Sequence, residues 1–174
     1  MFYKLPSTTY IPTGAVLVVP KEALLLMGQG LAPYREARLE GCCFLYGPRG
    51  GSNEVSISYL VFPKQVNNPK NYTVSSEAIA EMSAATRPLE IVNRMQIHTH
   101  PGRWVDHSPY DDEHAISRKA VSVVLPYYGA TIDAWPKGIG VHEFQTEKWH
   151  LLSKQHAEQR IRLVEGGLDI IDLR

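Results

Sequence analysis

Two histidines and an aspartate stand at short spacings in "MQIHTHPGRWVDHSPYDDEHAIS", residues 95–117. His98 and His100 are one residue apart in a segment with the pattern of a strand, where side chains at i and i+2 point to the same face. Their imidazoles can therefore converge on one ion. Zinc takes histidine nitrogens and a carboxylate oxygen at about 2.0–2.2 Å, and a catalytic zinc keeps one position for water. Asp111 is the candidate carboxylate.

The segment Ser108-Pro109-Tyr110-Asp111 also has an ordinary structural interpretation. Serine at the cap, proline at the first helical position and aspartate at the third are typical of a helix start, a capping box with Asp in place of Glu or Gln. The same geometry would hold Asp111 on the first helical turn beside the strand end, with Ser108 close by. An isolated His-x-His is more often incidental than metal-binding, so the metal hypothesis depends on the full spacing H-x-H-x7-S-x-x-D.

The elements that must position these residues follow from periodicity and turn residues. Helix 21–40 is expected to be interrupted near Gly28, Gly30 and Pro33, and residues 64–73 are expected to form a loop. Strands 41–47 and 54–63 are expected to pair as a hairpin. The predicted strands are 13–20, 41–47, 54–63, 91–100, 121–129, two within 138–153, and 168–173; the predicted helices are 21–40, 75–88, 108–120 and 154–165.

This mixture predicts one α/β (α+β) domain over residues 1–174, with a mixed central β-sheet flanked by helices. The motifs lie in a core of about residues 15–150, and residues 154–173 add a C-terminal helix and strand.

Composition restricts the class of protein. Lys plus Arg and Asp plus Glu are equal at 18 each in 174 residues, so we expect no nucleic-acid partner and no anionic membrane surface. No apolar run approaches the roughly 20 residues of a membrane span, and the first residues lack the apolar region of a secretory signal, so a cytoplasmic location is expected. Cys42 and Cys43 are adjacent, which predicts two small buried hydrophobic residues and no disulfide framework.

The spacing of His98, His100, Ser108 and Asp111 resembles the signature of the JAMM (MPN+) zinc metalloprotease family. That family also has an upstream glutamate in a pattern near E-x-x-G-x-x-x-G, which "EGCCFLYG" resembles from Glu40 onward. The final glycine matches at Gly47, whereas Cys43 replaces the internal one, and Glu36 is the fallback for the glutamate. Residues 67–79 are similar to the segment that precedes the His-x-His strand in this family. The resemblance implies an MPN/JAB-like domain with a cytidine-deaminase-like layout.

The resemblance also implies roles for these residues. His98, His100 and Asp111 would hold one catalytic Zn²⁺, Glu40 would act as general base and then general acid, and Ser108 would hydrogen-bond the oxyanion.

Three neighbouring residues have separate interpretations. His107, next to Ser108, could touch substrate but is expected to be a solvent-facing loop residue, and His114 could lie in a second shell around the ligands. Trp104 is either a packed anchor or part of a substrate groove. His142, His150 and His156 lack metal spacing and are interpreted as structural.

Members of the family cut the amide after the glycine-ending tail of ubiquitin or a ubiquitin-like protein. The short chain is similar to compact prokaryotic members, which implies a deubiquitinase-like isopeptidase or a precursor-processing protease. A bacterial ubiquitin-like conjugation or antiviral system, with E1-like and E2-like partners, is the implied setting. The alternatives are a peptidase for sulfur-carrier proteins, a metal-free MPN scaffold, and a DNA-associated relative, against which the neutral charge argues.

Overall fold

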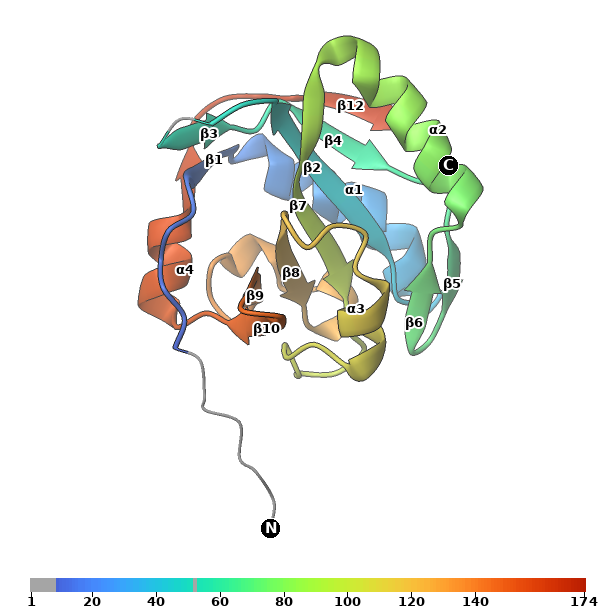
Figure 1. The fold of residues 1–174 in the computed structure, drawn as a ribbon. Helices are drawn as coiled ribbons and strands as arrows, with labels where there is room; N and C mark the ends of the chain where they lie inside the picture. Colours follow the sequence, from blue (N-terminus) through green and yellow to red (C-terminus); the bar gives the residue numbers. More distant parts are fainter. Residues whose placement is uncertain (1–8, 52) are drawn as a thin grey trace.

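A seven-stranded mixed sheet lies at the centre of the computed structural model, which describes residues 9–51 and 53–174 (Figure 1). Its strands, in spatial order, are β10 (Lys148–Leu151), β9 (Gly140–Gln145), β8 (Val121–Leu125), β7 (Ile91–Thr99), β2 (Cys42–Pro48), β4 (Tyr59–Phe62) and β12 (Asp169–Asp172). The pairs β7–β8 and β4–β12 are parallel, and the other neighbouring pairs are antiparallel. A smaller sheet contains β11 (Ile161–Val164), β1 (Val16–Pro20) and β3 (Glu54–Ser56), and β5 (Val66–Asn68) forms a hairpin with β6 (Asn71–Thr73).

The helices pack on both sheets, and two of them cover opposite faces of the central sheet. The helices are α1 (Glu22–Glu36), α2 (Ser76–Thr86), α3 (Pro109–His114) and α4 (Lys154–Arg160), with short 3₁₀ turns η1 (Arg87–Leu89), η2 (Tyr127–Gly129) and η3 (Ile132–Ala134). Along β2, Cys43 and Leu45 pack in the cluster that contains residues of α1, while Cys42 and Phe44 pack in the cluster that contains Met82 of α2. A strand buried on both faces explains the continuous apolar run of 41–47. The predicted mixed α/β (α+β) domain is confirmed, and both cysteines are buried as expected.

Helix α1 runs without a break through Gly28, Gly30 and Pro33, so the predicted interruption is wrong. Packing overrides the local preference, because Ala23, Met27 and Leu31 are fully buried against the sheet. Glycine at position 30 has a packing reason: a Cβ there would lie 2.0 Å from the Phe62 ring. The helix therefore approaches β4 more closely than any larger residue would permit.

The predicted hairpin of 41–47 with 54–63 is correct only for its second half. Residues 59–62 form β4 and pair with β2, but residues 54–56 form β3 and pair in parallel with β1 in the smaller sheet. The change of partner occurs where the Ile57 amide donates to the Val18 carbonyl and the Ser58 amide donates to the Tyr46 carbonyl. The segment predicted as one strand thus forms two strands that belong to different sheets.

Residues 64–73 were predicted to be a loop, and the structure contains the β5–β6 hairpin there instead. The turn is stabilised by Asn68, whose side-chain oxygen accepts hydrogen bonds of 2.9 Å from the amides of Lys70 and Asn71. Pro69 occupies the second turn position, where its fixed φ is favourable. Turn chemistry of this kind outweighs the polar composition on which the loop prediction depended.

Two predicted helices are shorter than expected. Helix α3 ends at His114 rather than continuing to residue 120, because Gln96 of β7 accepts a hydrogen bond from the Ile116 amide and donates one to the Ser117 carbonyl. Helix α4 ends at Arg160, and the chain continues as β11 beside β1, where Ile161 is buried opposite Leu17. The prediction for 75–88 is confirmed by α2 and its Ser75 cap, which accepts from the Ala78 amide.

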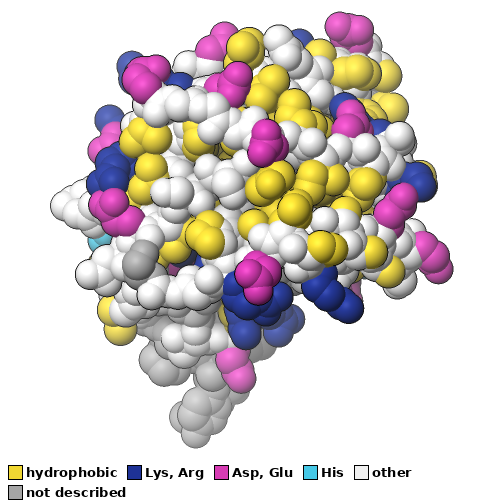
Figure 2. Space-filling view, turned by 90° about the horizontal axis from the view of Figure 1, so that it is seen from above, with side chains coloured by type: hydrophobic (Ala, Val, Ile, Leu, Met, Phe, Trp, Pro, Cys, Tyr) yellow, Lys and Arg dark blue, Asp and Glu magenta, His cyan; other side chains and the backbone are white. Residues whose placement is uncertain are grey.

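Charged side chains of both signs surround patches of hydrophobic side chains on the upper face of the molecule (Figure 2). Among the described residues, no helix combines the length and the apolar character that a membrane crossing requires.

Candidate metal centre

Strand β7 and the residue after it carry the two histidines to the point where the chain leaves the sheet. His98 lies opposite Cys42 in the antiparallel pairing with β2 and opposite Val124 in the parallel pairing with β8. His100 follows the strand, and its amide donates to the Leu125 carbonyl at 2.8 Å, which extends the pairing. Both imidazoles therefore leave the same face of the sheet, as the i, i+2 spacing predicts. Residue exposure is 2% for His98 and 9% for His100, so both are shielded from solvent.

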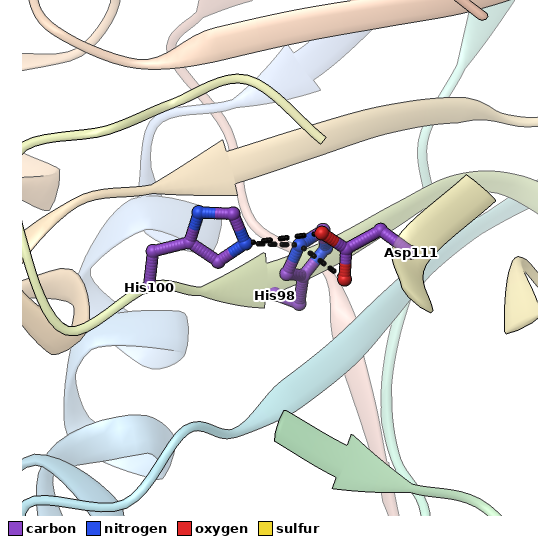
Figure 3. A group of neighbouring side chains, drawn as sticks. All are labelled: His98, His100 and Asp111. Atoms are coloured by element: carbon purple, nitrogen blue, oxygen red, sulfur yellow. Dashed lines mark hydrogen bonds and ion pairs between the residues drawn. The ribbon is translucent and has the colours of Figure 1, made fainter. Parts of the chain in front are cut away.

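Helix α3 brings Asp111 to these histidines (Figure 3). The predicted capping box is present: the Ser108 hydroxyl accepts from the Asp111 amide, and the Ser108 amide donates to Asp111 Oδ2 at 2.6 Å. The Ser108 hydroxyl also donates to Asp111 Oδ2 at 2.7 Å. The cap interpretation and the ligand interpretation are therefore compatible, because the bonds that start the helix also orient the Asp111 carboxylate toward β7.

Two imidazole nitrogens and both oxygens of one carboxylate converge at this point. The Nε2 atoms of His98 and His100 are 3.2 Å apart, His98 Nε2 is 3.3 Å from Asp111 Oδ1, and His100 Nε2 is 3.2 Å from Asp111 Oδ2. Ligands about 2.0–2.1 Å from an ion at tetrahedral angles lie roughly 3.3 Å from one another. One ligand atom from each of the three side chains lies within 4.8 Å of the other two, so the three could share one ion and leave a further position open. Two imidazoles and a carboxylate are also a donor set suited to zinc.

The hydrogen bond at the other nitrogen of His100 supports this fit. Nδ1 of His100 lies 3.1 Å from the Trp104 carbonyl oxygen, which can only accept, so Nδ1 donates. In the neutral ring, Nε2 is then a bare acceptor that faces the Asp111 carboxylate, another acceptor. Such an arrangement needs a cation or a proton between the two atoms. A backbone carbonyl that fixes the tautomer of a histidine is a usual companion of metal ligation.

Electrostatics favour the ionised carboxylate. Burial alone would raise the pKa of Asp111, but hydrogen bonds from His100, His98 and Ser108 hold it well below its usual range. Burial alone would lower the pKa of His100, but its hydrogen bond and charge interaction with Asp111, together with the charge of Glu40, raise it above its ordinary value. In the metal-free chain the cluster therefore attracts positive charge, which a divalent ion would supply.

Glu40 is fixed beside this cluster through its backbone. The Glu40 amide donates to the Asn68 carbonyl at 2.9 Å, and the Asn67 side-chain amide donates to the Glu40 carbonyl at 2.7 Å. The amide of the next residue, Gly41, donates to the Thr99 hydroxyl at 2.9 Å, and the Thr99 amide donates to the Gly41 carbonyl at 3.0 Å. This register places Glu40 opposite His100. Glu40 is 3% exposed, whereas the fallback Glu36 lies exposed in the last turn of α1.

Burial is the largest influence on the Glu40 carboxyl group. It raises the pKa of Glu40 to about 7, with the charge of His100 lowering it and that of Asp111 raising it. Glu40 lies outside the group of side chains whose donor atoms can share one ion. A buried carboxyl group with a pKa near neutrality, beside a site that could hold a cation, has the properties of a general base.

The raised pKa predicts a pH-dependent stability of the metal-free chain. In the folded state Glu40 binds a proton between pH about 4.5 and about 7 that it has released in the unfolded state. The free energy of unfolding should therefore fall as pH rises through this window, by up to about 3 kcal/mol from this group. Glu40→Gln removes the titration, so the variant should show a flatter profile in urea unfolding from pH 5 to pH 8 with chelator present.

The exposed Glu36 provides the control for this measurement. Glu36→Gln should keep the slope of the wild-type profile. Parallel profiles for wild type and Glu40→Gln would contradict the prediction.

The other residues singled out near the signature differ in their burial and in their contacts. His107 was expected to face solvent, and this is wrong: its side chain is 4% exposed because β8, β9 and α3 surround it, and burial lowers its pKa to about 4. Trp104 is 66% exposed, which excludes the packed anchor, although its carbonyl orients His100. His114 stacks on Tyr110 with ring centroids 3.9 Å apart. His142 is buried on β9 and packs on His107.

Sequence reasoning missed Tyr72 and Asn67, which come from the hairpin that was predicted to be a loop. The Tyr72 ring centroid lies 5.4 Å from that of His98, and the Tyr110 hydroxyl donates to the Tyr72 carbonyl at 3.1 Å. A cavity of about 320 Å³ lies beside Asp111 between β6, α2 and α3, with Tyr72, Val74, Ile79, Tyr110 and His114 among its walls. The Asn-Pro-Lys-Asn turn was the signal that could have revealed this hairpin.

No family model and no curated protein matches this chain. Solved structures are similar in fold. The solution structure of a protein from Desulfitobacterium hafniense has a TM-score of 0.59 and 17% sequence identity, over 87% of this chain and 94% of that chain. The solution structure of a protein from Salinibacter ruber has a TM-score of 0.54 and 18% identity, over 78% of this chain and 88% of that chain. At these identities the comparison establishes a shared α/β fold and no residue roles.

Proposed function

We propose that this chain is a zinc-dependent peptidase of the JAMM (MPN+) kind. The observation that carries the proposal is the buried cluster of His98, His100 and Asp111, in which the two Nε2 atoms and the two carboxylate oxygens make contacts of 3.2–3.3 Å. A buried acid with a pKa of about 7 stands beside that cluster at Glu40. Metal ligands and a separate general base are the two requirements of a metal-assisted amide hydrolysis.

The chain's own residues divide the reaction between them. Zinc bound by the three ligands would supply an acidified water and polarise the scissile carbonyl. Glu40 accepts the proton of the attacking water and later delivers it to the leaving amine, which its near-neutral pKa suits. Ser108 has a single hydroxyl proton, which goes to Asp111 Oδ2 in this structure. A role in hydrogen-bonding the oxyanion therefore requires that this hydroxyl turn toward the substrate.

The proposed substrate is the amide bond after the C-terminal glycine of a ubiquitin-like protein. Within residues 9–51 and 53–174, β6 pairs on one side only, with β5, and lies next to His98 through Tyr72. An extended tail could lie along such an edge, as in other cases of strand addition. The neighbouring cavity of about 320 Å³ offers aromatic and aliphatic walls for a side chain of that tail. Glycines next to the scissile bond would let the backbone approach the ligands closely.

Either deconjugation or precursor processing fits this chemistry. Both reactions cut an amide after glycine, and they differ only in the leaving group, a lysine side chain or a main-chain amine. A bacterial ubiquitin-like conjugation or antiviral system with E1-like and E2-like proteins is the proposed setting, and sulfur-carrier processing is the variant with a different substrate protein.

The test measures zinc and hydrolysis together. Metal-free chain is supplied with zinc, and zinc per folded chain is determined beside cleavage of a Gly-Gly tail joined to a fluorogenic amine. We expect about one zinc per chain, hydrolysis that a chelator stops, and recovery when zinc is returned. A folded chain that binds no zinc, or hydrolysis that persists in chelator, would refute the proposal. The first of these results would favour a metal-free scaffold.

A further inference from the structure

His107 contacts four elements of the fold from inside the loop between β7 and α3. Its Nε2 lies 2.8 Å from Ser122 Oγ on β8, and its Nδ1 lies 2.9 Å from Asp112 Oδ1 on α3. Its ring stacks on His142 of β9, with ring centroids 3.9 Å apart and planes inclined by 20°. The ring also meets the edge of Trp149 on β10 at a centroid distance of 5.0 Å. One buried side chain thus connects α3 to strands β8, β9 and β10.

The direction of these hydrogen bonds follows from the groups involved. A carboxylate only accepts, so Nδ1 of His107 donates to Asp112, and Nε2 of the neutral ring accepts from the Ser122 hydroxyl. The order Ser–His–Asp is that of a serine hydrolase triad. Ser122 is 2% exposed within the central sheet, however, so no substrate can reach it as a nucleophile. Because both ring nitrogens are engaged, His107 is also not a ligand of the neighbouring centre.

Asp112 stands next to Asp111 on a helix of only six residues. Such a short helix is not stable by itself, so its position depends on contacts made by its side chains and cap. The two adjacent carboxylates hold the helix through different partners. Asp111 contacts His98 and His100, and Asp112 accepts a hydrogen bond from His107. The loop lies directly on β9, since a Cβ at Gly140 would be 2.1 Å from the Val105 carbonyl oxygen.

We infer that His107 is a positioning residue of the metal centre. Through Asp112 and Ser122, it holds the first turn of α3 at the place where Asp111 completes the ligand set begun by His98 and His100. The inference rests on the metal centre of the proposed function. It assigns a role to a residue that belongs neither to the H-x-H-x7-S-x-x-D spacing nor to the upstream glutamate pattern.

Zinc affinity and the electronic spectrum of the Co²⁺-substituted chain test this inference without any substrate. His107→Leu keeps much of the packing volume and removes both hydrogen bonds, and Asp112→Ala removes one partner. Both variants should bind zinc roughly 10–100-fold more weakly in competition with a chromophoric chelator, as is typical when an outer-shell partner is lost. Both should also shift the Co²⁺ absorption bands. Asp112→Asn keeps an oxygen that accepts from Nδ1 and should retain nearly the wild-type affinity and spectrum.

The control is Val55→Ala, which removes buried volume from β3 in the smaller sheet. It should lower the free energy of unfolding and leave zinc affinity and the Co²⁺ spectrum unchanged. If His107→Leu fails to fold, Ser122→Ala is the milder variant, because it removes only the hydrogen bond to His107 Nε2. It should bind zinc more weakly than the wild type. If His107→Leu and Asp112→Ala both keep wild-type affinity and spectrum, the inference is overturned and the proposed function stands. If the folded wild type binds neither zinc nor Co²⁺, the proposed function and the inference are both overturned.

Discussion

Glu40→Gln is expected to slow amide hydrolysis by roughly 10²–10⁴-fold, the range attributed to a lost general acid–base group. Glutamine has nearly the same shape, and the backbone hydrogen bonds that fix this position, with Asn67 and Asn68, do not involve the side chain. Because Glu40 lies outside the group of donor atoms that can share an ion, zinc per chain should remain at the wild-type value. The rate with saturating substrate and the zinc content, measured on the same preparation, check this prediction.

Glu36→Gln is the matched control for this experiment. Glu36 is exposed at the end of α1, four residues before Glu40, and it is the other glutamate that could satisfy the upstream pattern. Its replacement should leave the rate unchanged. A wild-type rate in Glu40→Gln would remove Glu40 from the mechanism, and a loss of rate in Glu36→Gln would move the assignment to that residue.

The parts of the centre that could be predicted are those fixed by short stretches of chain. The i, i+2 spacing of His98 and His100 and the capping box of Ser108 and Asp111 depend only on local geometry, and both are present as expected. The step that joins them is the return of α3 to the end of β7, and it crosses the ten residues between His100 and Asp111. Local geometry does not fix where the chain goes over that distance. The expectation that Asp111 meets the two histidines therefore depended on the resemblance to a known signature.

Residues placed by long-range contacts could not be predicted. His107 has the sequence surroundings of an exposed loop residue, and its burial arises from Ser122 and His142, which lie on strands far along the chain. The position of Glu40 depends on the β2–β7 register and on Asn68 of the hairpin. The same limit applies to the fold: β11 is a strand because β1 lies beside it, although residues 161–164 continue a helical pattern.

Asp111→Asn is expected to weaken zinc binding by at least two orders of magnitude, more than the loss of an outer-shell partner. The substitution removes the only carboxylate in the group of donor atoms that can share an ion. In the wild type, saturating zinc should raise the free energy of unfolding, by about 2.7 kcal/mol when free zinc is one hundred times its Kd. At the same zinc concentration Asp111→Asn should gain far less. Thermal unfolding with and without zinc, together with zinc competition, measures both effects.

Asparagine is chosen at position 111 because it removes the charged ligand while keeping the hydrogen bond that starts the helix. Its side-chain oxygen can still accept from the Ser108 amide, which donates to Asp111 at 2.6 Å, so the start of α3 is retained. Asp106→Asn changes an exposed carboxylate on the same loop and should leave zinc binding intact. If Asp111→Asn folds and binds zinc as tightly as the wild type, the carboxylate is not a ligand, and the short distances among the three side chains reflect hydrogen bonding alone. If it folds and zinc no longer stabilises it, metal binding and the capping box are separate properties of one aspartate.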